Sequence, residues 1–409
     1  MRDLLEESFR AAVAAADPLR ILAQHLPSPP RGRTFVAAAG KAAASMALAV
    51  ERNFGGNLEG IAITRYGHGL PTAKIRVIEA GHPVPDEAGE AAAREILEKT
   101  KALKSDDLLL ALLSGGGSSL LSLPAPDIPM AELKALTREL LRSGAAIQEM
   151  NTVRKHLSAI HGGRLAAASK APVLALIISD VTGDDPTHIA SGPCAPDPTT
   201  YADAREILAH YRVIPPGAIK RRLEKGEDET PKPGDPVFAR VQNKVIATAH
   251  RSLEAAAEVF RWNGIEPVIL GDTLTGEASE VAKVFAALIH EIRTYGRPWK
   301  PPVALISGGE CTVTIRGEGG RGGRCAEFLL SLGIETEEIW AIAADTDGID
   351  GSEDNAGAVL SPDSLQRGRD ARALLARHDS YGFFSALGDL VSTGPTRTNV
   401  NDYRAILVL

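Results

Sequence analysis

The stretch "LLLALLSGGGSSLLSL" (108–123) is an apolar run that changes abruptly to serine and glycine and then resumes. A short continuous apolar run that ends in such a turn is typical of a strand buried on both faces. The stretch "PVALISGGECTV" (302–313) repeats the pattern much later in the chain. The sequence therefore predicts two buried strands that each end in a loop of small residues.

Other apolar runs of strand length alternate with longer stretches of helical periodicity. Buried strands separated by helices indicate a parallel sheet that is covered on both faces. We therefore expect a doubly wound, Rossmann-like α/β arrangement, in which ligands bind beyond the carboxyl ends of the strands. The predicted strands include 33–40, 60–65, 75–81, 108–116 and 172–180, and the predicted helices include 86–103 and 129–144.

The length of 409 residues favours two domains. The segment 221–242 is charged and contains proline, which indicates a linker or its edge. The α/β alternation restarts at "NKVIATA" (243–249), and the alternating "CTVTIRGEG" (311–319) predicts an antiparallel, half-exposed strand in a mixed sheet. We expect a Rossmann-like N-terminal domain at 1–235 and an α/β domain with a mixed sheet at 236–409, with an active site in the cleft between them.

Composition and charge exclude several classes of protein. The net charge of -7 argues against nucleic acid as the main partner. No apolar stretch approaches the roughly 20 residues of a membrane span, and 1–20 carries early acids, unlike a signal peptide. The three cysteines, Cys194, Cys311 and Cys325, form no CxxC pair, so we expect no disulfide framework and a cytoplasmic location.

Lys41 stands where a predicted buried strand ends at Gly40 and a helix begins. A cation there opposes the helix dipole, which indicates that an anion is expected nearby. Glycine lets backbone N–H groups converge on an anion and serine adds hydroxyl donors, although each loop could equally be a tight turn. Neither loop has the Walker ending. The predicted binding residues are Ser114, Gly115, Gly116, Gly117, Ser118 and Ser119 in the first loop, and Ser307, Gly308, Gly309 and Glu310 in the second.

Three aspartates follow the predicted strand 172–180 in the segment "ISDVTGDDPTHIASGPCAPD". Carboxylates at the end of a strand can hold Mg²⁺ or accept a proton from a hydroxyl group. The alternative is a capped turn, because Asp and Gly are common turn formers. We expect a functional role for Asp180, Asp184 and Asp185, and a structural role for His188.

The glycines Gly317, Gly319 and Gly322 satisfy the dinucleotide fingerprint G-x-G-x-x-G. The preceding strand alternates in polarity, however, unlike the buried first strand of a nicotinamide site. Arg321 and Arg324 lie within the same turn, and arginine forks suit carboxylate and phosphate oxygens. We therefore interpret this segment as an anion clamp.

The segment "IAADTDGIDGSEDNAGA" (342–358) ends another apolar strand with Asp345, Asp347, Asp350 and Asp354. It does not fit the calcium-binding EF-hand pattern, but a metal or nucleotide edge is consistent with it. A dense polar loop beside a terminal strand favours a pocket lining over a simple turn. That loop contains Thr393, Gly394, Thr396, Thr398, Asn399, Asn401 and Asp402.

The combined motifs resemble those of the class II glycerate 2-kinases, whose C-terminal region is named the MOFRL domain. Relatives have also been labelled hydroxypyruvate reductases. The resemblance runs in order from about Leu5 to the last residue. It is carried by "AAGKAAASMA", "LLSGGGSSLL", "MNTVRKHLSAIHGGRLA", "ISDVTGDDPTHIASGPCAPD", "ISGGECTVTIRGEGGRGGRCAEFLL", "DTDGIDGSEDNAGA" and "TGPTRTNVND".

The resemblance implies transfer of the ATP γ-phosphoryl group to the 2-hydroxyl of D-glycerate, with Mg²⁺, in a monomer or homodimer. Relatives usually have an Asn-Gln pair where Cys325 and Ala326 stand, so two hydrogen-bonding side chains that would orient substrate are lost here. The family's functional residues fall on Lys41, on Asp180 or Asp184, on Arg321 or Arg324, and on Asp345 or Asp347. As metal ligands we expect Asp184, Asp185 and Asp347.

Phosphoryl transfer needs charge neutralisation, alignment and a group that receives the hydroxyl proton. We expect Lys41 and an arginine of 321–324 to neutralise charge, and an aspartate of 180–185 to act as base or metal ligand. The two loops of small residues would hold nucleotide or substrate, and 393–402 would close over them. Two alternatives are a hydroxypyruvate reductase, which needs a nicotinamide site, and a non-catalytic protein that binds a sugar acid or a nucleotide.

Overall fold

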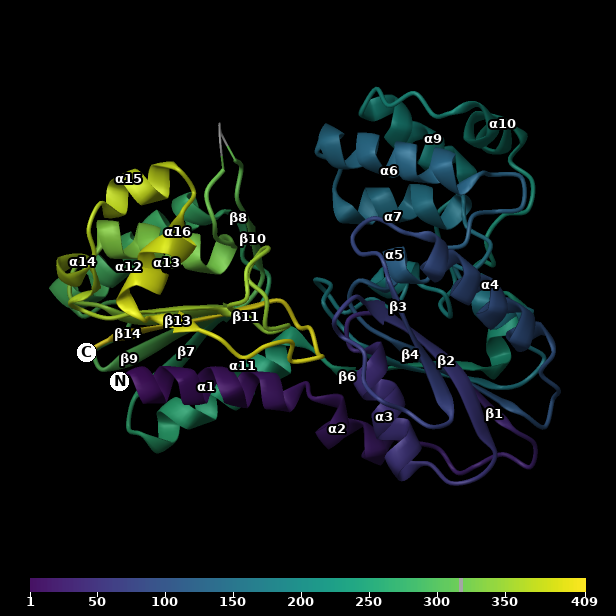
Figure 1. Cartoon of the computed structure of the whole chain (residues 1–409), viewed down its shortest axis with the longest axis horizontal. Helices are drawn as coiled ribbons and strands as arrows, with labels where there is room; N and C mark the ends of the chain where they lie inside the picture. Colours follow the sequence, from purple (N-terminus) through teal and green to yellow (C-terminus); the bar gives the residue numbers. More distant parts are fainter. Residues whose placement is uncertain (316–318) are drawn as a thin grey trace. The chain divides into compact units, whose positions relative to one another are not determined.

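The computed structural model describes residues 1–315 and 319–409. Its contacts divide the chain into two compact units. We term Pro18–Ile246 the N-unit, and Met1–Asp17 with Ala247–Leu409 the C-unit. Figure 1 colours both by sequence. The described residues include no helix long and apolar enough to cross a bilayer.

The boundaries of these two units differ from the domain boundary that we expected between residues 235 and 236. The apolar face of α1 (Arg2–Ala15), with Leu5 and Phe9, packs in one cluster with Phe260 of α11 (Ala249–Trp262). The first helix therefore belongs to the C-unit, because its core covers that apolar face. The expected first strand of the second domain is instead β6 (Val241–Ala247), the outer strand of the N-unit sheet.

The N-unit sheet has the order β3-β2-β1-β4-β5-β6, and its first five strands pair in parallel. This confirms the doubly wound α/β arrangement. Each strand of the centre is a buried run, as the continuous apolar sequence predicts. The strands are β1 (Thr34–Ala39), β2 (Leu58–Arg65), β3 (Ile75–Ala80), β4 (Leu108–Leu113) and β5 (Val173–Ile178).

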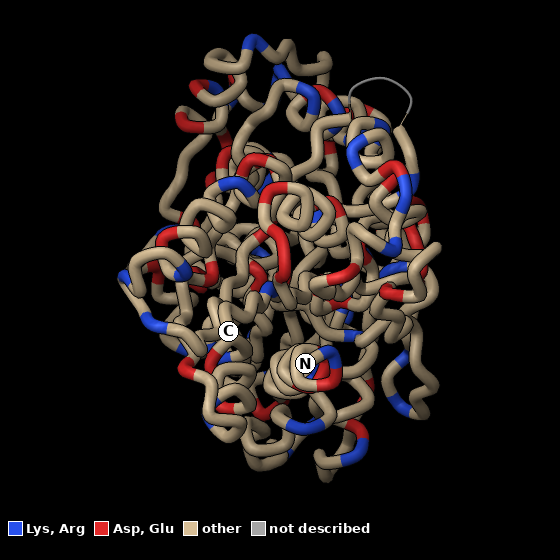
Figure 2. The backbone as a smooth tube through the Cα atoms, turned by 90° about the vertical axis from the view of Figure 1, so that its left-hand side faces the viewer, with Lys and Arg blue, Asp and Glu red and all other residues tan. Residues whose placement is uncertain are grey.

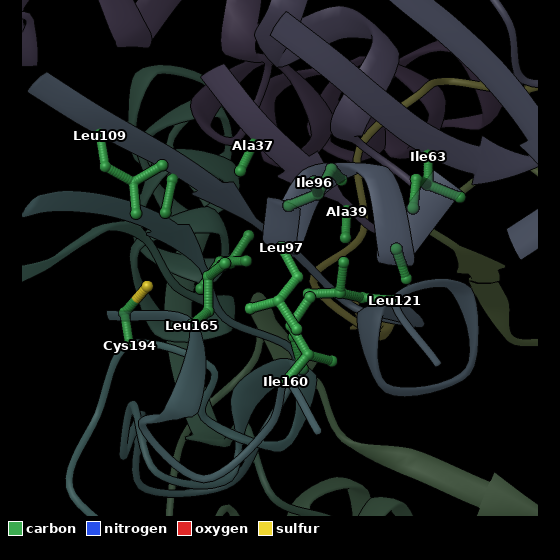
Figure 3. Close-up of a cluster of buried hydrophobic side chains, with 14 of the residues drawn as sticks. Ala37, Ala39, Ile63, Ile96, Leu97, Leu109, Leu121, Ile160, Leu165 and Cys194 are labelled. Carbon is green, nitrogen blue, oxygen red and sulfur yellow. The ribbon is translucent and has the colours of Figure 1, made fainter. Parts of the chain in front are cut away.

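Helices cover this sheet, and four of them group beyond it. The close-up of Figure 3 shows Ile96 and Leu97 of one covering helix beside Ala39 of the sheet. The helices α6, α7, α9 and α10 stack together in Figure 1, around a cluster that includes Leu140 and Met150. The N-unit helices are α2 (Pro18–Ile21), η1 (Leu22–His25), α3 (Ala43–Asn53), α4 (Glu87–Lys101), α5 (Gly117–Leu120), α6 (Met130–Ser143), α7 (Ile147–His156), α8 (Arg164–Ala168), η2 (Ile189–Ser191), α9 (Tyr201–His210), α10 (Gly217–Lys225) and η3 (Pro236–Arg240).

The C-unit has a mixed sheet of order β13-β12-β11-β14-β9-β7, as expected. β7 and β9 pair in parallel, whereas the terminal strand β14 is antiparallel to both β9 and β11. Two apolar clusters cover its opposite faces, one with α1 and α11 and the other with α12, α13 and α16 (Figure 1). The strands are β7 (Glu266–Gly271), β9 (Val303–Ser307), β11 (Trp340–Asp345), β12 (Gly357–Leu360), β13 (Leu390–Val391) and β14 (Asp402–Val408), and the remaining helices are α12 (Ala278–Tyr295), α13 (Arg324–Glu335), α14 (Ser364–Arg367), α15 (Ala371–Ala376) and α16 (Ser380–Leu387).

The antiparallel strand expected at 311–319 is wrong. Among the residues described there, the strand is β10 (Glu310–Thr312), and it pairs in parallel with β8 (Thr275–Glu277) in a separate ladder. The carboxylate of Glu277 accepts hydrogen bonds from the N–H and the hydroxyl of Thr314, just after the three paired residues. The rest of that segment includes residues 316–318, which lie outside the described residues.

Candidate functional site

Lys41 and the first loop of small residues meet at the carboxyl ends of β1 and β4. These strands pair with Ala39 beside Leu113, so their ends are level. The Lys41 N–H then donates to Gly115 O over 2.8 Å, and the next N–H, of Ala42, donates to Ser114 Oγ over 3.1 Å. The close approach of these two segments thus holds the backbone of Lys41 at the loop.

Gly116, at the centre of this loop, touches Lys41 and a histidine that sequence analysis missed. Its φ of +80°, in the left-handed region, favours glycine, and an added Cβ would lie 2.9 Å from His82 Nε2 and 3.5 Å from Lys41 Cγ. Lys41 and His82 therefore flank the same turn. A single histidine after a strand carries no distinctive pattern, and only its position beside Gly116 indicates a role.

The electrostatics around His82 are strongly positive. Burial, and then the basic groups Lys41, Arg65, His68 and Arg154, together lower the pKa of His82 to about 3. The imidazole is thus neutral at neutral pH. Burial alone would disfavour a charge of either sign, whereas the neighbouring basic groups would stabilise an anion at this end of the sheet.

A chain of hydrogen bonds connects the same loop to α7. Ser191 Oγ lies 2.8 Å from Ser118 Oγ and 3.1 Å from Asn151 Oδ1. Arg154 Nη1 donates to the same Asn151 oxygen. Burial lowers the pKa of Arg154 to about 10. Ser118, which was predicted, is thereby joined to three polar residues that were not.

The family motif around Arg154 contained the signal for these residues. Asn151 and Arg154 are three positions apart, so they share a face of the helix. Lys155 lies on another face, where its ammonium forms a fully buried ion pair of 2.8 Å with Asp197. The helical period therefore separates a structural lysine from an arginine at the site.

The three aspartates after β5 have distinct surroundings. Asp180 is half-buried directly after the strand, and Asp184 has a φ of +55°. The carboxylate of the exposed Asp185 accepts the N–H of Thr187 over 2.8 Å, as in a capped turn. His188 accepts a hydrogen bond from Asn151 through its backbone oxygen. The described residues contain no group of three or more His, Cys, Asp or Glu that could hold a metal ion.

In the C-unit, Arg324 begins α13 and is surrounded by carboxylates. Its Nε donates to Asp402 over 2.8 Å, its Nη2 to Asp345 over 2.6 Å, and its Nη1 lies 3.3 Å from Glu310. Although burial opposes it, these carboxylates raise the pKa of Arg324 well above its ordinary value. Arg324 therefore organises three acids, while its role as an anion clamp stays a prediction.

The other predicted clamp residue, Arg321, is exposed, and its guanidinium carbon lies 4.8 Å from the centre of the Tyr381 ring. Such cation–π contact fixes an arginine without neutralising its charge. Of the dinucleotide fingerprint, Gly317 lies outside the described residues, whereas Gly319 and Gly322 are described.

The second loop of small residues is tightly packed around Arg404, which sequence analysis missed. The fully buried Arg404 donates to Gly308 O over 2.8 Å and to Asp402 Oδ2 over 2.7 Å. The Gly308 N–H donates to Gly271 O, and Ser307 is buried. These contacts favour the alternative interpretation of this loop, a tight turn, over an anion cradle.

The acidic loop after β11 and the loop before β14 lie together. Asp345 and Asp347 each accept a nearby backbone N–H over 2.9 Å. Thr396 donates its N–H to Asp347 O, and Thr346 donates to Asn401 O. The buried Asn399 accepts the N–H of Asn401 over 3.3 Å, and Thr393 is exposed.

Asp350 has a structural role that the sequence did not indicate. Its two carboxylate oxygens accept the N–H groups of Cys325 and Ala326 over 3.0 and 2.9 Å, in the first turn of α13. Burial raises the pKa of Asp350 to about 7. The positions of the family's Asn-Gln pair thus contribute backbone donors to this carboxylate.

A pocket of about 230 Å³ opens beside Arg324 in the C-unit. Its lining includes Cys311, Glu327 and His378. The His378 Nδ1 lies 3.1 Å from both oxygens of Glu327, and burial raises the pKa of that carboxyl. The pocket is large enough for a small polar group.

Comparison with known proteins matches both parts of the chain. Residues 4–224 match a domain of unknown function, DUF4147, and residues 303–402 match the MOFRL family. A protein of Agrobacterium vitis provisionally named hydroxypyruvate reductase is 51% identical over 100% of this chain and 94% of its own. Glycerate 2-kinase of Pyrococcus horikoshii is 40% identical over 95% and 93%, respectively. The crystal structure of glycerate kinase from Thermotoga maritima has a TM-score of 0.88 at 37% identity, and covers 100% of this chain and 99% of that one.

The fold defines an α/β protein of two units, the first with a parallel sheet and the second with a mixed one. The chain belongs to the class II glycerate kinase family, of which the MOFRL domain forms the C-terminal part.

Proposed function

We propose that this protein is an ATP-dependent glycerate 2-kinase that transfers the γ-phosphoryl group to the 2-hydroxyl of D-glycerate and releases 2-phosphoglycerate. The observation that carries the proposal is the positive site at Gly116, where Lys41 and His82 flank the loop. Relatives named glycerate kinase support the reaction class.

In this proposal Lys41 neutralises charge on the transferred phosphoryl group. A compact ammonium next to a loop of serines and glycines can follow that charge as it moves between oxygens. Hydrogen bonds from the Lys41 and Ala42 N–H groups to the loop preorganise the lysine, so little rearrangement is needed during the reaction. In the C-unit, Arg321 and Arg324 stay the predicted anion-binding cations.

The proton of the 2-hydroxyl needs an acceptor, and Asp180 and Asp184 remain the candidates. Both follow β5 and both are half-buried. Asp185 is a weaker candidate because its carboxylate already accepts the N–H of Thr187. A general base must lie within hydrogen-bond reach of the proton that it removes.

ATP and Mg²⁺ are the cofactors that we propose. Mg²⁺ commonly binds through one or two carboxylates and substrate phosphates, not through a cage of protein ligands. The half-buried Asp180 and Asp184 fit this kind of binding, and Asp347 is the candidate in the C-unit. When bound, Mg²⁺ would neutralise charge on the nucleotide phosphates.

The direct test is ³¹P NMR of the product formed from D-glycerate, ATP and Mg²⁺. We expect the resonance of 2-phosphoglycerate together with ADP. A 3-phosphoglycerate resonance would contradict the proposed position of transfer. Absence of ADP with several 2-hydroxy acids would favour the non-catalytic alternative.

A hydroxypyruvate reductase is the second candidate function, because the Agrobacterium vitis relative carries that name. It would need a nicotinamide site. Absorbance at 340 nm with NADH and hydroxypyruvate separates the two functions, since only a reductase oxidises NADH. We expect no change in absorbance.

We further propose a cytoplasmic protein that is a monomer or a homodimer. Cys194, Cys311 and Cys325 are free and buried, which suits a reducing compartment. Acidic and basic residues are interspersed along the backbone in Figure 2, so no basic face for nucleic acid is expected. Light scattering of the purified protein tests the oligomeric state.

A further inference from the structure

We propose that Arg154 and His82 bind the carboxylate of the hydroxy-acid acceptor, next to Lys41 in the N-unit. The inference rests on the proposed function and extends it, since it names the residues that recognise the acceptor. Its chemical class of ligand is a small 2-hydroxycarboxylate.

The guanidinium of Arg154 is oriented but not neutralised. Its Nη1 donates to Asn151 Oδ1, and Asn151 is held in turn by Ser191 and by the His188 carbonyl. Within the described residues, no carboxylate oxygen lies within 4.0 Å of an Arg154 nitrogen. The side chain is half-buried, and a partly desolvated cation that has no carboxylate partner is stabilised by an anionic ligand.

The edge of Arg154 opposite Asn151 fits a carboxylate. With Nη1 directed at Asn151, Nε and Nη2 remain as two parallel donors. A planar carboxylate accepts both at once, in the bidentate geometry that distinguishes arginine from lysine. The carboxylate of the acceptor does not move during the reaction, so it suits this rigid fork.

His82 approaches the same place from β3. Its ring lies beside Gly116, and its position is set by the preceding Gly81, whose N–H donates to Asp86 over 2.8 Å. The groups that contribute most to the electrostatics at His82 are Lys41, Arg65, His68 and Arg154, which are all basic. The neutral imidazole can donate its N–H to an oxyanion in this surrounding.

A phosphoryl group of the nucleotide is the other source of oxyanions, and kinetics separates the two. The test compares Arg154→Ala, Arg154→Lys and His82→Gln with the wild type, and measures KM for D-glycerate and for ATP separately. Arg138→Ala is the matched control, since Arg138 is an exposed arginine of the neighbouring α6.

We expect Arg154→Ala to raise KM for D-glycerate about tenfold or more, because a charge-assisted bidentate contact is lost. KM for ATP should change less than about twofold. Arg154→Lys should recover part of the loss, because the positive charge is kept although the bidentate fork is lost. His82→Gln should raise KM for D-glycerate by a smaller factor. A rise in KM for ATP with KM for D-glycerate unchanged would overturn the proposal in favour of a phosphoryl contact.

Calorimetry of D-glycerate binding in the absence of ATP keeps this inference separate from the proposed reaction. Binding by the wild type, lost in Arg154→Ala and retained in Arg138→Ala, supports the carboxylate site even if no phosphorylated product is found. Equal binding by the wild type and Arg154→Lys, Arg154→Ala and His82→Gln refutes it even if the kinase reaction is confirmed. Circular dichroism of each variant verifies folding, and Arg154→Lys serves where the alanine variant does not fold.

Discussion

Two adjacent basic residues, Arg154 and Lys155, have opposite roles in this molecule. Lys155 is neutralised by Asp197 in the interior, whereas Arg154 has only an amide oxygen as its polar partner among the described residues. A buried ion pair that loses one partner costs several kcal/mol, so Lys155 is required for stability. Residue type alone does not distinguish these two roles, because both side chains are basic. The helical period places Arg154 and Lys155 on different faces of α7, and the face decides which of them meets a carboxylate.

We expect Lys41→Ala to lower kcat by two orders of magnitude or more, while cooperative unfolding is retained. The side chain is half-buried, and the loop is held by the backbone N–H of residue 41, which alanine keeps. Steady-state kinetics and thermal unfolding measure the two effects. Near-normal turnover would remove Lys41 from the mechanism.

The carboxyl of Asp350 predicts a pH dependence of stability. Because burial raises its folded-state pKa to about 7, the folded protein binds this proton more tightly than the unfolded chain. The contribution of Asp350 is therefore complete below the unfolded pKa of about 3.9 and is lost as pH rises to about 7.

We expect the stability of the wild type to fall by up to about 1.4 kcal/mol per pH unit relative to that of Asp350→Asn across this window. Above about pH 8 the difference between the two should be constant. Urea unfolding at a series of pH values measures it. A wild type that gains stability relative to Asp350→Asn as pH rises from about 4 to about 7 would contradict the assignment.

At the scale of elements, the strands were predicted best, because an apolar run of strand length flanked by small residues has few alternative structures. The predicted strands 33–40, 108–116 and 172–180 contain β1, β4 and β5. The strand expected at 311–319 was wrong, because alternation shows which face is buried but not which strand will pair with it.

A glycine in the turn after β9 and a second glycine elsewhere in the C-unit allow the effect of a crowded contact to be separated from the effect of backbone strain. Gly309 has a φ of +94°, and an added Cβ would lie 2.1 Å from Leu274 O. Gly388 has a φ of +70° with open space around it. Both positions favour glycine, but only the first is also crowded.

We expect Gly309→Ala to destabilise the C-unit by several kcal/mol, because the backbone of the turn must move, and Gly388→Ala by only about 1 kcal/mol. Chemical unfolding of the two variants measures the difference. Equal losses would show that strain alone, and not the close contact, requires glycine at 309.

At the scale of the whole molecule, the first helix and the last strand belong to one unit. Phe9 of α1 lies against Tyr403 of β14 with ring centres 5.9 Å apart, and the Tyr403 hydroxyl donates to Ser8 Oγ. Phe9→Ala should therefore destabilise the C-unit by about 3–5 kcal/mol and leave the N-unit nearly unchanged. Hydrogen exchange resolved by segment would detect this.

The exposed Arg10 on the same helix is the matched control, because Arg10→Ala removes only a surface ion pair with Glu6. We expect hydrogen exchange of the control to match the wild type. Loss of protection across 18–246 in Phe9→Ala would contradict the assignment of α1 to the C-unit.

The sequence by itself determined the α/β class, the two sheets, the family and the identity of Lys41 and the first loop as a candidate site. These depend on local patterns, namely apolar period, glycine spacing and motif order. Only the tertiary structure decided that α1 joins the C-unit and that Arg324 and Arg404 are paired with carboxylates. It also decided that His82 lies beside the same glycine as Lys41 and that hydrogen bonds connect Arg154 to the first loop. Such contacts join residues far apart in the chain, and they depend on the packing of whole elements, which no local pattern encodes.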